Sequence, residues 1–127
     1  MLASGPPFFS FVAARFVARR LGVPLVLDYR DEWSECPFDF VQNGGDDREW
    51  EARCLRDAAA VLFTTESHRQ HQLERFAQLD AARAHLVPNG WEPADLPPAA
   101  PVASSLYDGR FFLAHVGTLA GHTPPGD

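Results

Sequence analysis

The chain has 127 residues, a length typical of one domain, and its 46% hydrophobic and 22% charged residues are typical of a globular protein, which excludes a disordered chain. A formal net charge of −6 gives no electrostatic reason to expect nucleic acid or anionic lipid as a partner. No apolar run approaches the roughly 20 residues of a membrane span. Cys36 and Cys54 lack paired metal-ligand spacing, so we expect a cytoplasmic protein with free thiols.

The first elements expected along the chain are a strand end, a helix and a buried strand. Residues 1–5 resemble the end of a strand that turns at Gly5 and two prolines into a helix. That helix, at 8–21, is apolar around nearly its whole circumference, so we expect it to be mostly covered, by a part of the protein that is missing here. The short apolar run at 25–27 predicts a buried parallel strand.

Beyond a turn-rich loop, helical patterns alternate with short apolar runs. Such alternation predicts right-handed crossovers and a parallel sheet with helices on its faces. The expected elements are a loop at 34–46, a helix at 47–59, a buried strand at 60–64, a helix from Thr65 to about Leu79 that buries Leu73, Phe76 and Ala77, and a buried strand at 84–87 closed by a turn at 88–90.

The composition changes after Glu92. Residues 93–109 are rich in proline and alanine and predict a linker, and the apolar run at 111–116 predicts another buried strand. We therefore expect a partial α/β domain at 1–92 and the start of a second domain at 110–127. Because neither sheet can bury itself with so few elements, we expect the chain to be a piece of a larger protein.

Candidate ligand-binding residues follow the strand at 25–27. Ligands of parallel α/β sheets bind beyond the carboxyl ends of the strands, where Asp28, Arg30 and Asp31 fall. Arg30 can hold a phosphate or carboxylate through two parallel hydrogen bonds, and Asp28 or Asp31 can orient or deprotonate a hydroxyl. An internal Asp–Arg pair that only fixes the loop explains these residues equally well.

A metal site is the weaker interpretation of three polar residues on one helix. His68, His71 and Glu74 recur at every third position, yet no further ligand is apparent, so we expect a solvated helix face and no metal. His115 is expected to be a core histidine. Three tryptophans, Trp33, Trp50 and Trp91, are expected to be packing residues.

Five segments in a fixed order carry a resemblance to a known family. They are SGPP (4–7), GVPLVLDYRDEW (22–33), the stretch 51–65 with its E-x-x-x-L-x-x-A pattern, VPNGWE (87–92) and FFLAHVGTL (111–119). In this order they resemble the family 4-like glycosyltransferases, two-domain GT-B enzymes with facing Rossmann-like halves. The resemblance implies an incomplete Rossmann-like N-terminal domain, with a parallel sheet and flanking helices, plus the first strand of a second domain.

The resemblance also implies a function. Such enzymes transfer a sugar from a nucleotide-sugar donor to a carbohydrate or lipid-linked acceptor, with no tightly bound cofactor, no nucleic acid, and peripheral membrane contact only through parts outside this chain. The implied site residues are Asp28, Arg30 and Asp31 on the acceptor side, Asn89, Gly90 and Glu92 at the hinge, and Gly117 and Thr118 beside the donor diphosphate.

The chain also departs from the family pattern. Ala120, Gly121 and His122 stand where a basic residue is expected to meet the donor phosphates, so we expect the isolated chain to lack transferase turnover. One alternative is a non-catalytic remnant or binding module. Another is a phosphohydrolase with Asp28 as nucleophile, although Arg30 then occupies the place of the usual second carboxylate.

Overall fold

The computed structural model describes residues 1–36, 44–92 and 94, and residues Met1–Asn89 form one compact unit. Its elements are β1 (Leu2–Gly5), α1 (Phe9–Leu21), β2 (Val26–Tyr29), α2 (Asp47–Asp57), β3 (Ala60–Phe63), α3 (Glu66–Arg75), the 3-10 turn η1 (Ala81–Arg83) and β4 (Ala84–Leu86). The predicted linker, apart from Ala94, and the predicted strand at 111–116 lie outside the described residues.

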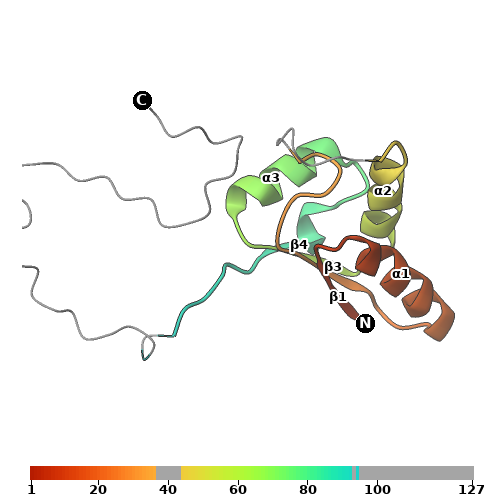
Figure 1. The fold of residues 1–127 in the computed structure, drawn as a ribbon, viewed down its shortest axis with the longest axis horizontal. Coiled ribbons are helices and arrows are strands. Elements are labelled where there is room, and N and C mark those ends of the chain that lie inside the picture. The colour runs from red at the N-terminus through yellow and green to blue at the C-terminus, as the bar shows by residue number, and fades with distance from the viewer. Residues whose placement is uncertain (37–43, 93, 95–127) are drawn as a thin grey trace, which may run out of the picture. The chain divides into compact units, whose positions relative to one another are not determined.

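The four strands form one parallel sheet in the order β1-β2-β3-β4, which confirms the predicted α/β fold class with a Rossmann-like parallel sheet. When parallel strands follow one another across a sheet in chain order and every crossover is right-handed, the connecting helices all lie on the same face of the sheet. Figure 1 accordingly shows α1, α2 and α3 on one side of the strands. The sheet residues on that face are buried in a single core: Ala3, Leu27, Tyr29, Val61 and Phe63.

The opposite face of the sheet carries the alternate residues of each strand. These side chains are half-buried or exposed along β1, β2 and β3. Among the described residues no helix covers this face, so the expected helices on both faces are found on one (Figure 1).

Helix α1 is covered on one side by the described elements. Only one stripe of it, Phe11, Ala14 and Ala18, is buried in the core. Four large apolar side chains remain exposed on its other sides: Phe9, Phe16, Val17 and Leu21. Among the described elements α1 packs through a single face, against β1 and α2, so its covering by other parts of the protein stays a prediction.

Two element boundaries differ from the predictions in ways that affect the site. Strand β2 continues to Tyr29, beyond the predicted end at 27, so Asp28 lies within the paired strand rather than after it. Helix α3 ends at Arg75, where Phe76 turns to an extended conformation and its N–H donates to the Gln72 carbonyl. Phe76 is buried as predicted, whereas Ala77 points outward and is exposed.

Gly5 tests the packing at the carboxyl end of β1. A Cβ at this position would lie 2.7 Å from Phe8 Cδ1 and 3.0 Å from Phe11 Cζ. We expect Gly5→Ala to lower the free energy of unfolding by about 1–3 kcal/mol, because overpacking forces these rings to move. Gly45→Ala is the matched control, since nothing lies within 4 Å of its Cβ. Equal urea midpoints for both variants would contradict this packing.

Candidate functional site

The carboxyl end of β2 brings Asp28 and Arg30 together, as predicted. The Ser4 hydroxyl donates to Asp28 Oδ2 over 2.9 Å, and Arg30 Nη1 lies 3.8 Å from Asp28 Oδ1. The Arg30 backbone N–H donates to the Gly5 carbonyl, which holds the residue against β1. The internal Asp–Arg pair therefore exists. Because the Arg30 side chain is 46% exposed, the guanidinium still presents N–H donors to solvent, where a ligand can meet them.

The other predicted site residues are exposed, belong to the second unit or lie outside the described residues. Asp31 is exposed beside Arg30, and Asn89 is exposed after β4. The β3–β4 pairing extends to Val87, whose N–H donates to the Phe63 carbonyl. Gly90 and Glu92 fall in the separate unit Gly90–Asp127, and Gly117 and Thr118 lie outside the described residues. The compact unit thus joins Asp28 with Arg30 and leaves the hinge and donor-side residues as predictions.

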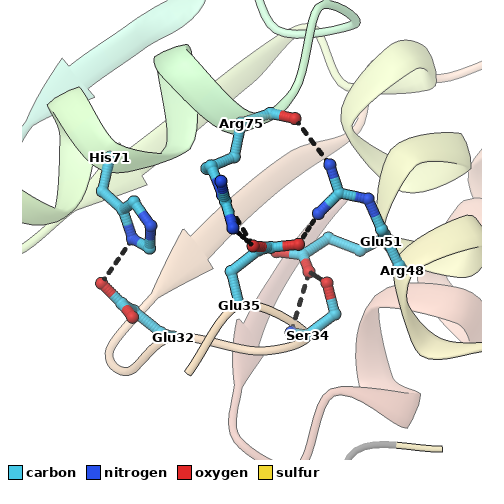
Figure 2. Close-up of polar contacts among 7 residues, drawn as sticks. All are labelled: Glu32, Ser34, Glu35, Arg48, Glu51, His71 and Arg75. Carbon is cyan, nitrogen blue, oxygen red and sulfur yellow. Dashed lines mark hydrogen bonds and ion pairs between the residues drawn. The ribbon is translucent and has the colours of Figure 1, made fainter. Parts of the chain in front are cut away.

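A buried carboxylate next to this edge was not predicted as a site residue. Glu51, in the middle of α2, is fully buried. Its Oε1 accepts a hydrogen bond of 3.1 Å from the Tyr29 hydroxyl. Its Oε2 accepts from the Ser34 N–H at 2.9 Å and from the Ser34 hydroxyl at 2.5 Å (Figure 2). The available signal was its spacing: Glu51 precedes the core residue Leu55 by one helical turn, so both face inward.

Burial shifts the pKa values of both Glu51 and Tyr29. Loss of hydration raises the pKa of Glu51, while the hydrogen bonds from Ser34 and Tyr29 act in the opposite direction. Burial also raises the pKa of Tyr29 well above its ordinary value, and the neighbouring Glu51 adds to the increase. The Tyr29 phenol therefore stays protonated at neutral pH and acts as a hydrogen-bond donor.

The loop after β2 is also held by α2 and α3 at its rim. Glu35 accepts a 2.7 Å hydrogen bond from Arg75 Nε and forms an ion pair with Arg48, whose Nη2 in turn donates to the Arg75 carbonyl (Figure 2). Three residues earlier in the loop, Glu32 Oε1 lies 3.1 Å from His71 Nδ1. Both helices thus contact the segment that follows Arg30 and Asp31.

The prediction of a solvated face for the α3 histidines is wrong for His68. Its ring is buried and packs edge-on against Tyr29 and Phe63, with centroid distances of 5.7 and 5.1 Å. The reason is that α3 begins beside the ends of β2 and β3, which turns its first inward position onto their aromatic side chains. Burial lowers the pKa of His68. Glu74 is exposed as expected.

No group of three or more His, Cys, Asp or Glu residues in the described part of the chain is arranged to hold a metal ion. The helices of that part are also too short or too polar to cross a membrane. Cys36 and Cys54 are both free thiols, as expected.

The three tryptophans differ in their surroundings. Trp33 is buried and stacks on Phe8 at a centroid distance of 5.3 Å, which confirms its packing role. Trp50 is half-buried against Phe16. Trp91 is 70% exposed, so its prediction as a packing residue is wrong within the described residues. His115 lies outside them.

The parallel sheet with polar residues at its carboxyl edge defines an α/β domain of the class in which ligands bind beyond the carboxyl ends of the strands. Residues 1–90 match the family described as Glycosyl transferase 4-like domain. Since this match spans most of the 127 residues, the chain belongs to that family, which confirms the resemblance drawn from its sequence segments. No curated protein matches the chain.

The buried ring of His68 predicts a pH dependence of stability. Its pKa is lowered in the folded state from about 6.5, so the unfolded chain binds a proton more readily as the pH falls below that value. As the pH falls below about 6.5, we therefore expect the unfolding free energy of the wild type to decrease more than that of His68→Leu. Urea titrations at several pH values measure this difference.

His85→Gln is the control for this titration, because His85 is exposed on β4. Its stability should follow that of the wild type across the same pH range. Parallel curves for the wild type and His68→Leu would show that the buried ring has no altered proton affinity and would overturn the prediction.

Proposed function

We propose that this protein serves the acceptor side of a glycosyltransferase that moves a sugar from a nucleotide-sugar donor to an acceptor hydroxyl. The observation that carries this proposal is the family match over residues 1–90. Within it, residues 1–92 act as the acceptor-side domain, 93–109 as the linker, and 110–127 as the start of the donor-binding domain. No tightly bound cofactor is involved, and the nucleotide sugar is a substrate.

We assign to Arg30 the binding of a negatively charged group on the acceptor. It sits at the carboxyl edge of the sheet with a half-exposed guanidinium, which is open to a phosphate or carboxylate group of the acceptor. A guanidinium binds such groups through two parallel hydrogen bonds. Asp28, 3.8 Å from Arg30 Nη1, orients the guanidinium from the side of the strand.

Asp31 is the candidate for the acceptor hydroxyl. It is exposed next to Arg30, so a sugar hydroxyl can approach its carboxylate, which can orient the hydroxyl or take its proton. Asp28 is less suited to this role, because Ser4 already donates to one of its oxygens and Arg30 lies near the other. The same contacts disfavour Asp28 as the nucleophile of a phosphohydrolase.

The donor side of the proposal rests on residues whose positions are predictions. Asn89, Gly90 and Glu92 form the hinge, and Gly117 and Thr118 lie beside the donor diphosphate. Backbone N–H groups there stabilise the charge that develops on the leaving diphosphate.

Acceptor binding by Arg30 tests the proposal. We expect Arg30→Ala to weaken the binding of phosphorylated sugars by roughly tenfold or more, because a charge-assisted hydrogen bond contributes about 1.5–3 kcal/mol. Ligand-observed NMR titrations with the 127-residue chain measure the dissociation constants, with nucleotide sugars titrated alongside.

Arg20→Ala is the matched control for charge, because Arg20 is exposed at the end of α1 and forms no ion pair with any described residue. Its affinity should equal that of the wild type. Equal affinities for Arg30→Ala and the wild type would exclude Arg30 from the site. If the wild type bound no sugar phosphate at all, the non-catalytic remnant would become the better interpretation.

A further inference from the structure

One side chain holds both ends of the segment 29–34, which begins the loop that follows β2. Tyr29 is the last residue of that strand, and Ser34 lies where the loop reaches α2. Glu51 accepts hydrogen bonds from both: Oε1 accepts from the Tyr29 hydroxyl, and Oε2 accepts from the Ser34 N–H and hydroxyl (Figure 2). The chain between these residues is therefore fastened at its two ends to the same buried carboxylate.

The loop has buried ends and an exposed middle. Tyr29 is fully buried, and Trp33 is buried on the ring of Phe8. Arg30 and Asp31, between them, are exposed. An anchored loop of this form presents its middle residues to a ligand in one geometry, so little conformational freedom is lost on binding.

The rim contacts of the same loop are weaker anchors. The Glu35 side chain is only 11% exposed, but the Arg48 and Arg75 side chains that hold it are both more than half exposed, so solvent screens these ion pairs from the arginine side. Glu51 differs because it has no contact with solvent. Removing a hydrogen-bonded partner from a buried site leaves the remaining groups unsatisfied, so the loop depends most on this residue.

We propose that Glu51 is a positioning residue, which sets the direction in which Arg30 and Asp31 meet the acceptor by fastening Tyr29 and Ser34. It touches no ligand itself. This inference rests on the proposed function of Arg30 and Asp31 at the acceptor, while the anchoring of the loop can be measured without any ligand.

Glu51→Gln tests the inference, because it keeps the side-chain volume and places an amide N–H₂ group where an acceptor oxygen stood. In the full 127-residue chain, we expect the Ser34 amide, whose N–H donates to Glu51, to exchange with deuterium at least tenfold faster in this variant, while the amides of β3 remain unchanged. Binding of the same sugar phosphates should weaken several-fold. Hydrogen exchange and ligand-observed NMR measure the two effects.

Glu49→Gln is the matched control on the same helix, since Glu49 is exposed and pairs only with Arg53 among the described residues. It should leave loop exchange and affinity unchanged. Tyr29→Phe, which removes one donor and keeps the buried ring, takes the place of Glu51→Gln if that variant does not fold.

Two results would overturn the proposal. Unchanged exchange of the Ser34 amide in Glu51→Gln would show that Glu51 does not hold the loop. Uniformly faster exchange across the sheet, with loop and core affected alike, would show a role in overall stability only. If the wild type binds no sugar phosphate, the proposed function fails, whereas the exchange pattern still decides whether Glu51 anchors the loop.

Discussion

A carboxylate removed from water destabilises a fold unless donors surround it, and the carboxyl edge of this domain is organised around one such group. Glu51 lies in the core under the end of β2, where Tyr29 and Ser34 supply its donors. The hydrogen bond from Tyr29 joins α2 to the sheet, and those from Ser34 join α2 to the loop. The exposure of Arg30 and Asp31 follows from these contacts, because their neighbours on both sides are held inside.

The topology explains why this arrangement forms here. Strands added in one direction bring all three helices onto one face, so the inward sides of α1, α2 and α3 converge on Tyr29 and Phe63. The residues that alternate with these, including Asp28, lie on the opposite face, where Ser4 of the neighbouring strand meets Asp28. The two sides of the strand end thus have different roles: one anchors the loop, and the other carries the polar pair available to a ligand.

Much of the fold could be predicted from the sequence, because short apolar runs separated by amphipathic helices permit few arrangements. The pairing of Asp28 with Arg30 was also foreseeable, since both lie at one strand end. Glu51 and His68 were missed as buried groups, because a charged or polar residue in a helix is normally assigned to solvent and only tertiary contacts reveal an inward donor or ring. The sequence also could not show which side of α1 packs on the sheet, because the apolar pattern shows which side chains can be buried, whereas the neighbouring elements decide which ones are.

The hydrogen bond between Tyr29 and Glu51 is the central claim, and a double-mutant cycle measures it most directly. Unfolding free energies of the wild type, Tyr29→Phe, Glu51→Gln and the double variant give the coupling between the two side chains. A buried bond to a carboxylate predicts a coupling of at least about 1 kcal/mol. Effects that add within roughly 0.3 kcal/mol would contradict the account, because the two groups would then stabilise the domain independently.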